Sequence, residues 1–136
     1  MVSFEIPTRI ILPRKTKKGL SFPLNVNAFA NQHHRIKHNA KMVFYEHIEA
    51  LNLQPLTPPI RLHYKYYSEA NRDFDEANVG GGLDKFLCDA LVHCGVIPDD
   101  SYRYVKHYTF EYMGVKKHEW HDTRLKGLAV VDVRKV

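Results

Sequence analysis

The sequence predicts a single α+β domain in which a mixed β-sheet packs against two or more helices. The chain has 136 residues, 44% of them hydrophobic, which suffices for one buried core and is too little for two ordinary domains. Stretches with the two-residue period of strands alternate along the chain with stretches of helical spacing. No internal repeat or change of composition marks a boundary, so residues 1–136 are expected to form one domain.

The first half of the chain predicts a strand, a helix and a second strand. Residues 4–12 are rich in Ile and predict a strand, in which Pro7 favours an edge position or a bend. The next twenty residues show no regular pattern. Apolar residues at helical spacing predict an amphipathic helix over residues 36–51, which Pro55 follows. Residues 60–67 then alternate apolar and polar side chains, as a half-buried strand does.

The second half predicts one further helix and two further strands. Residues 83–94 carry an apolar stripe at helical spacing, and Gly95 is well placed to end this helix. Residues 96–100 indicate a sharp turn. Residues 102–113, rich in Tyr, and residues 128–136, rich in Val, predict strands joined by a polar, basic connection.

Charge is distributed very unevenly along the chain. Eight of the fifteen acidic residues lie between Glu69 and Asp100, a segment with only two basic residues and a net charge of −6. The remaining 104 positions hold eighteen Lys and Arg against seven Asp and Glu, a net charge of +11. A cationic body around an acidic centre suggests that a polyanion and a divalent metal ion meet here.

The location expected from the sequence is the cytoplasm. No apolar run reaches the roughly eighteen residues that cross a membrane, and the N-terminus lacks a basic region followed by an apolar stretch. Cys88 and Cys94 lie on one predicted helix, roughly 9 Å apart along its axis, too far apart and too differently oriented to form a disulfide. Free thiols fit a reducing, intracellular setting.

The basic residues form groups that are candidates for binding nucleic-acid phosphates. One group lies in a predicted loop and the other precedes and begins the first helix. A basic pI alone is common among small proteins, so the clustering is the more informative observation. With Arg72, which adjoins the acidic segment, the candidate DNA-binding residues are Arg14, Lys15, Lys17, Lys18, Arg35, Lys37 and Lys41.

The acidic segment predicts a metal-dependent hydrolytic site. Asp73 and Asp75 are two residues apart, so in an extended segment both point to one side while Phe74 faces the core. A third carboxylate is expected from Asp100, which a strand-linking turn can return to the same edge of the sheet. Such carboxylates hold ions that activate water for phosphodiester hydrolysis, and Lys85 would neutralise charge developing on the phosphate.

Each of these features also has a purely structural interpretation. An Asp-x-Asp pair often belongs to a solvated turn, and Asp99 with Asp100 often forms a turn or a helix cap. Lys85 and Asp89 are one helical turn apart and can form a surface ion pair. Their order along the chain adds information that the separate features lack.

The order and spacing of these residues resemble the core signature of RusA-type Holliday-junction resolvases. The resemblance covers roughly thirty residues: Asn71-Arg72-Asp73-Phe74-Asp75, then Asn78, then Lys85 to Leu91, then Gly95 to Asp100. It implies that Asp73, Asp75 and Asp100 are metal-binding catalytic carboxylates and that Lys85 is the catalytic lysine. Asp89 and Asp99 match the signature without an assigned role, and Asn78 is a candidate although Glu76 and Ala77 separate it from the second aspartate, which the family's asparagine follows directly.

The same resemblance implies an activity and a set of partners. We expect a homodimeric, Mg²⁺-dependent endonuclease, with Mn²⁺ as an alternative ion, that cuts symmetrically across four-way DNA junctions in recombination and repair. Members of the family are often encoded by phages or prophages. A two-fold symmetric substrate requires two related active sites, which a homodimer supplies.

The chain departs from the family pattern between its second aspartate and its lysine. The connection from Asp75 to Lys85 is several residues longer than in the family and contains Gly80-Gly81-Gly82. We expect these glycines to form slack in a surface loop, the alternative being a close approach of the backbone to a phosphate. The longer connection leaves open a catalytically silent protein that binds branched DNA or RNA. A separate alternative is an enzyme that acts on flaps, forks or mismatched duplex.

Overall fold

The structure is a computed structural model that describes residues 2–15 and 17–136. The described residues form one α+β domain with a mixed four-stranded sheet, a small three-stranded sheet and three helices, which confirms the predicted fold class. In the larger sheet the order is β1 (Val2–Ile6), β7 (Leu128–Lys135), β4 (Ile60–Ser68) and β5 (Thr109–Val115). In the smaller sheet it is β3 (Leu20–Pro23), β2 (Arg9–Leu12) and β6 (Leu125–Lys126). The helices are α1 (Val26–Asn31), α2 (His34–Ala50) and α3 (Glu76–His93).

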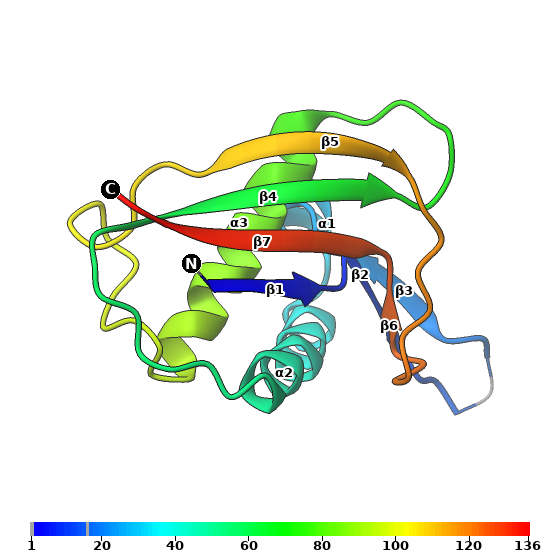
Figure 1. Cartoon of the computed structure of the whole chain (residues 1–136). Coiled ribbons are helices and arrows are strands. Elements are labelled where there is room, and N and C mark those ends of the chain that lie inside the picture. Colours follow the sequence, from blue (N-terminus) through cyan, green and yellow to red (C-terminus); the bar gives the residue numbers. More distant parts are fainter. Residues whose placement is uncertain (1, 16) are drawn as a thin grey trace.

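The direction of the strands decides where the candidate site residues lie. β1 and β4 both pair with β7 in antiparallel fashion, whereas β4 and β5 are parallel. A parallel pair needs a crossover connection, and here α3 supplies it, running back across one face of the sheet with α2 beside it (Figure 1). The chain therefore leaves one end of the sheet after β4 and returns along α3 to the other end before β5 begins.

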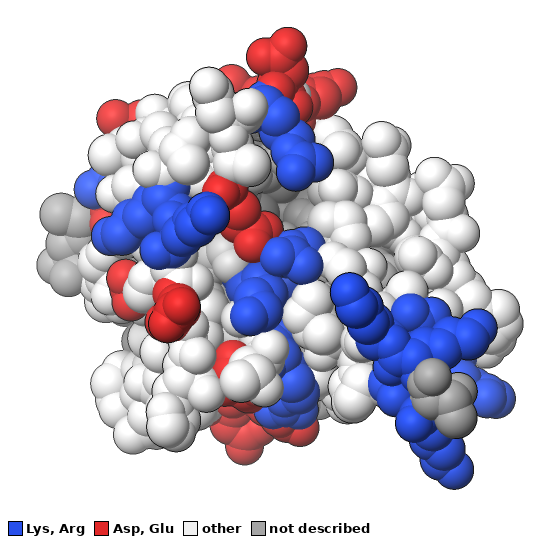
Figure 2. Space-filling view, turned by 90° about the vertical axis from the view of Figure 1, so that its right-hand side faces the viewer, with Lys and Arg blue, Asp and Glu red and all other residues white. Residues whose placement is uncertain are grey.

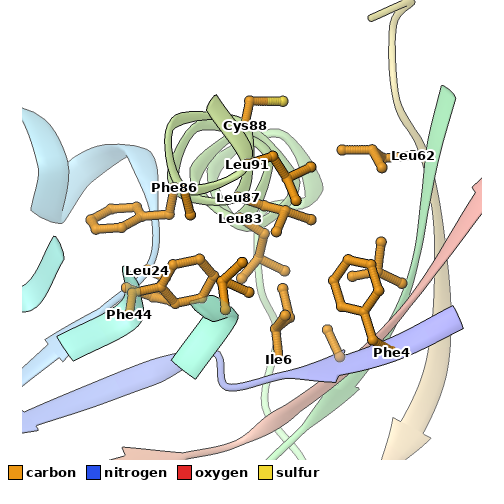
Figure 3. Close-up of a cluster of buried hydrophobic side chains, with 14 of the residues drawn as sticks. Phe4, Ile6, Leu24, Phe44, Leu62, Leu83, Phe86, Leu87, Cys88 and Leu91 are labelled. Atoms are coloured by element: carbon orange, nitrogen blue, oxygen red, sulfur yellow. The ribbon is translucent and has the colours of Figure 1, made fainter. Parts of the chain in front are cut away.

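The core lies between the larger sheet and the helices. Leu83, Leu87 and Leu91 follow helical spacing along α3 and point toward β1 (Figure 3). Phe86 lies at the centre of an aromatic group, with ring centroids 5.8 Å from Phe22 and 6.1 Å from Phe44. This packing fixes the position of α3, which carries most of the candidate site.

The prediction for residues 80–82 was wrong, because the three glycines are helical and α3 begins at Glu76, not at residue 83. A Cβ atom at Gly82 would overlap the backbone of Leu24 and Asn25, and one at Gly80 would press on the Tyr108 ring. The glycines let the chain before α1 and the chain before β5 pack directly against the helix. They serve close packing rather than loop flexibility.

Other element boundaries also differ from the sequence predictions. Residues 4–12 form two strands in different sheets, which separate at Pro7, where a missing N–H and a fixed φ favour a break. The stretch predicted as irregular contains β3 and α1, and the predicted strand from residue 102 begins only at Thr109. The predictions for α2 and β4 are confirmed to within two residues.

Within the part of the chain that the structure describes, no helix combines the length and the apolar character that crossing a bilayer requires.

Candidate functional site

Asp73 and Asp75 lie in the segment that connects β4 to α3, beyond the end of the sheet. Both are exposed, whereas Phe74 between them is partly buried. The Phe74 ring packs on Tyr66 and Tyr112, with centroid distances of 5.2 and 5.0 Å. The expected alternation is confirmed: the phenylalanine faces the protein and the two carboxylates face outward.

Asp75 is also the N-cap of α3. Its Oδ1 accepts hydrogen bonds from the backbone N–H groups of Ala77 at 2.9 Å and Asn78 at 3.4 Å. Asp is a favoured N-cap because its side chain satisfies N–H groups that have no partner within the helix, and negative charge is stabilised by the helix dipole there. The cap holds the Asp75 carboxylate in a fixed place at the start of α3.

Asn78 connects α3 to α1. Its side-chain oxygen accepts a hydrogen bond of 2.9 Å from the backbone N–H of Asn27. Asn25 caps α1 by accepting from the N–H of Ala28 at 2.8 Å, and Gly82 packs against the backbone at this same residue. Asn78 therefore fixes the position of α1 beside the acidic segment.

A cavity of about 400 Å³ opens beside Asp73. Arg9, Arg72 and Tyr66 contribute to its lining. The Arg9 guanidinium donates two hydrogen bonds to Glu69, Nη2 to Oε1 at 2.7 Å and Nε to Oε2 at 2.9 Å, and this pairing raises the pKa of Arg9. The lining of the cavity thus combines Arg9 and Arg72 with the carboxylates of Asp73 and Glu69, and Glu69 is paired with Arg9.

Lys85 lies on α3, well away from the Asp-x-Asp pair. Ten residues separate it from Asp75, which corresponds to roughly 15 Å along the helix axis. Its Nζ lies 3.5 Å from Oδ1 of Asp89, one turn further along, and Nζ of Lys41 on α2 lies 3.3 Å from Oδ2 of the same carboxylate. Asp89 is thus held between lysines of two helices.

Asp100 also lies far from the Asp-x-Asp pair. It follows the turn that Gly95 begins with a φ of 72°, and its backbone N–H donates to Oδ1 of Asp99 at 2.8 Å. Asp100 lines two depressions alongside the middle and the later turns of α3, one shared with Lys85 and the other with Asp89. The expected return of Asp100 to the edge that carries Asp73 does not occur.

The cause is the topology of β4 and β5. Val105, a few residues after Asp100, pairs with Ile60 at the start of β4, whereas Asp73 follows the end of that strand. Among residues 2–15 and 17–136, no group of three or more His, Cys, Asp and Glu side chains is placed to hold a metal ion. The structure does not bring Asp73, Asp75, Lys85 and Asp100 together at one point.

Asp84 is an acidic residue on α3 that was not among the site residues predicted from the sequence. Its Oδ1 accepts a hydrogen bond of 2.8 Å from the hydroxyl of Tyr64, which is fully buried in the core. Burial raises the pKa of Asp84, the hydrogen bond from Tyr64 lowers it, and the charge of Asp100 raises it again. The available signal was an Asp directly beside the apolar stripe, next to Leu83.

Cys88, one turn after Asp84, carries a protected thiol. It is 5% exposed, and burial together with the neighbouring carboxylate of Asp84 raises the pKa of the thiol well above its usual range. A nucleophilic cysteine needs the opposite shift.

The basic residues that the sequence singled out lie in two places. Arg14, Lys15, Lys17 and Lys18 are exposed in the loop between β2 and β3, whose Thr16 lies outside the described residues. Figure 2 shows Lys and Arg gathered in a patch at the height of this loop, while Asp and Glu gather at the top, where the segment between β4 and α3 lies. Arg35, Lys37 and Lys41 lie on α2.

Both basic groups belong to a long stretch without negative charge. Residues 6–45 hold eight Lys and Arg and no Asp or Glu. This stretch includes the smaller sheet's β2 and β3, all of α1 and most of α2, which borders α3.

No known protein family and no curated protein matches the chain.

Proposed function

We propose that this chain is a Mg²⁺-dependent, structure-selective endonuclease of the RusA type that cuts four-way DNA junctions as a homodimer in a bacterial or phage-infected cell. The observation that carries the proposal is the exposure of both Asp73 and Asp75 in one connection, where Asp73 lines a cavity together with Arg72. The resemblance of the surrounding motif to RusA-type resolvases supplies the reaction and the substrate.

The residues present fit an Mg²⁺ ion in one mode and not in another. A site that uses Asp73, Asp75 and Asp100 together does not fit, because the third carboxylate lies alongside the middle of α3. Mg²⁺ is often held by one or two carboxylates, several waters and the substrate's own phosphate oxygens, and Asp73 with Asp75 fits that mode. When bound, the ion would activate a water and stabilise the leaving oxygen.

The protein's own residues position the two carboxylates and neutralise the charge of the DNA phosphates. The N-cap bonds orient Asp75, and the packing of Phe74 against Tyr66 and Tyr112 orients Asp73 by fixing the residue between the two. Arg72 supplies positive charge in the lining of the cavity beside Asp73, whereas the charge of Arg9 is offset by its pairing with Glu69. Exposed lysines in the loop between β2 and β3 would bind phosphates further along the DNA.

A specific observation favours a second candidate function, a protein that binds branched DNA or RNA without cutting it. The roughly 15 Å between Asp75 and Lys85 separates two groups that the resemblance assigns to one reaction. A basic surface around an incomplete catalytic group would still bind nucleic acid.

Cleavage of a labelled four-way junction, with Mg²⁺ or EDTA, distinguishes the two candidates. We expect paired nicks near the branch point, no nicks in an equal-length linear duplex, and a loss of at least about a hundredfold in Asp75→Asn while junction binding is kept or tightened. Asn is as good an N-cap as Asp, so this variant keeps the fold. Glu76→Gln, which removes the adjacent exposed acid, is the matched control and should cut normally.

Two results would change the proposal. Tight junction binding without nicks, even with Mn²⁺, would replace the endonuclease by the silent binding protein. Cleavage of flaps or forks at the same rate as junctions would keep the enzyme and widen its substrate. Asp100→Asn tests the separated carboxylate: a loss equal to that of Asp75→Asn would show that Asp100 joins the pair during the reaction.

A further inference from the structure

Three lysines from two helices converge on one aromatic ring. The ring is that of Phe29 on α1, and the distances from its centroid to Nζ are 4.4 Å for Lys37, 5.3 Å for Lys41 and 5.9 Å for Lys85. Lys37 and Lys41 are one turn apart on α2, and Lys85 comes from α3. We call these three residues the lysine cluster.

The Phe29 ring is fixed in position by its contact with the core. Its ring packs edge-on against Phe86 at a centroid distance of 5.8 Å and an interplanar angle of 88°, and Phe86 is fully buried. The negative face of an aromatic ring attracts ammonium groups within about 6 Å, so one ring on the edge of the core holds three cations near one another. Like charges this close repel, and the arrangement therefore favours a bound anion.

The protein itself supplies less negative charge than the lysine cluster needs. Asp89 is shared by Lys41 and Lys85 and its side chain is 17% exposed, whereas that of Lys85 is 50% exposed. Asp100 lines the depression of about 430 Å³ that Lys41 and Asp89 also line. Among the described residues, Asp89 is the one carboxylate that forms ion pairs with the cluster, and one carboxylate against three ammonium groups leaves an excess of positive charge there.

We propose that the lysine cluster binds one backbone phosphate of the DNA strand that the Asp-x-Asp pair is proposed to cut. The inference rests on the proposed function and gives Lys85 a different role within it: it anchors DNA instead of acting at the metal. The roughly 15 Å between Asp75 and Lys85 exceeds the spacing of neighbouring phosphates in one strand, so the two contacts fall on different nucleotides. The cluster and the acidic pair thus bind the same strand at two points.

The first test measures binding to a junction in EDTA, where cleavage plays no part. The variant Lys37→Gln/Lys41→Gln/Lys85→Gln is compared with Lys117→Gln/Arg134→Gln/Lys135→Gln, which removes the same charge from exposed positions elsewhere. We expect the cluster variant to bind the junction at least about tenfold more weakly than the wild type. The slope of log affinity against log salt concentration should decrease in magnitude by about 0.9. Both changes should be larger than those of the control variant. Equal losses in both variants would overturn the proposal.

The second test locates the phosphate. A single neutral methylphosphonate linkage is moved stepwise away from the nicked bond, and at one position it removes the proposed contact from the DNA side. It should weaken binding of the wild-type chain several-fold and leave the cluster variant nearly unchanged, because the two changes remove one interaction. Equal weakening of both proteins by every single linkage tested would contradict the proposal.

Two single variants keep the test decisive if the triple variant does not fold. Lys37→Gln leaves both lysine contacts with Asp89 in place and should still weaken binding, while Asp89→Asn removes the competing carboxylate and should tighten it. No change, or changes of the opposite sign, would refute the lysine cluster. Absence of cleavage by the wild-type chain with these binding effects intact would refute only the endonuclease, whereas normal cleavage with binding unchanged in every variant would refute only the cluster.

Discussion

The aspartates at the start of α3 and those in its later turns have opposite surroundings. At the start, Asp73 and Asp75 are exposed, and the bonds to Asp75 come from backbone N–H groups. In the later turns, Asp89 is held between Lys41 and Lys85, and a third lysine lies near the same aromatic ring. Two aspartates on one helix thus have opposite surroundings: Asp75 accepts hydrogen bonds from backbone N–H groups at the start of α3, whereas Asp89 lies between two lysine ammonium groups.

Gly82→Ala should have the largest effect on this arrangement. The added methyl group would overlap the backbone of Asn25, which begins α1, so α1 and its Phe29 must shift away from α3. We expect a loss of about 3 kcal/mol in the free energy of unfolding, measured by urea denaturation.

Gly81→Ala is the matched control for that substitution. Its nearest neighbour is a side-chain methyl of Val26 at 3.1 Å, which can move, and alanine is a better helix former than glycine by about 1 kcal/mol. We expect stability within about 1 kcal/mol of the wild type. Equal losses at both positions would show that the two helices do not meet at Gly82.

Asp75→Ala and Asp73→Ala separate the two carboxylates at the start of the helix. Removing the N-cap at Asp75 should cost about 1 kcal/mol of stability, since two backbone N–H groups lose their acceptor. Asp73 is exposed, so its replacement should stay within about 0.5 kcal/mol. Thermal unfolding of both variants checks the difference, and equal shifts would mean that Asp75 does not cap α3.

The smallest predicted effect is a pH dependence caused by Asp84, which lies between the two regions. Burial raises its pKa in the folded state, so the folded chain binds more protons than the unfolded chain in the range above the usual pKa of an aspartate. Stability should therefore fall as pH rises through that range, and this contribution should be absent in Asp84→Asn.

Tyr64→Phe sharpens the same measurement. The hydrogen bond from Tyr64 lowers the pKa of Asp84, so its removal should raise that pKa further and extend the fall in stability to higher pH. Urea midpoints between about pH 4 and pH 8 test both variants. A pH dependence that Asp84→Asn leaves unchanged would assign it to other groups.

Elements whose apolar pattern is strong and local could be predicted from the sequence. α2 and β4 came within two residues of their ends because their apolar residues follow one period without interruption. The first turns of α3 were missed because three glycines are poor helix formers, and their packing partners come from residues 24–26 and 108–110, far away in the chain. Contacts between such distant segments outweigh local propensity here.

The direction of individual side chains in the candidate site was predictable from the sequence, but the distances between those residues were not. The outward direction of Asp73 and Asp75 follows from the alternation of side chains in an extended segment, which Phe74 anchors. The separation of Asp100 from that pair follows from the parallel pairing of β4 with β5, and the lysine cluster follows from the packing of α1, α2 and α3. Neither could be deduced from spacing along the chain.

By itself, the sequence determined the fold class, the uneven charge and the chemical character of each residue, because composition and local periodicity depend only on neighbours in the chain. The tertiary structure alone decided which charges meet. Gly82 allows the backbone before α1 to pack against α3, and α3 carries the chain back across the sheet between β4 and β5. These two features set the distances between residues that are far apart in sequence. Electrostatic interaction depends on those distances, so Asp89 is shared by two lysines while Asp75 faces solvent.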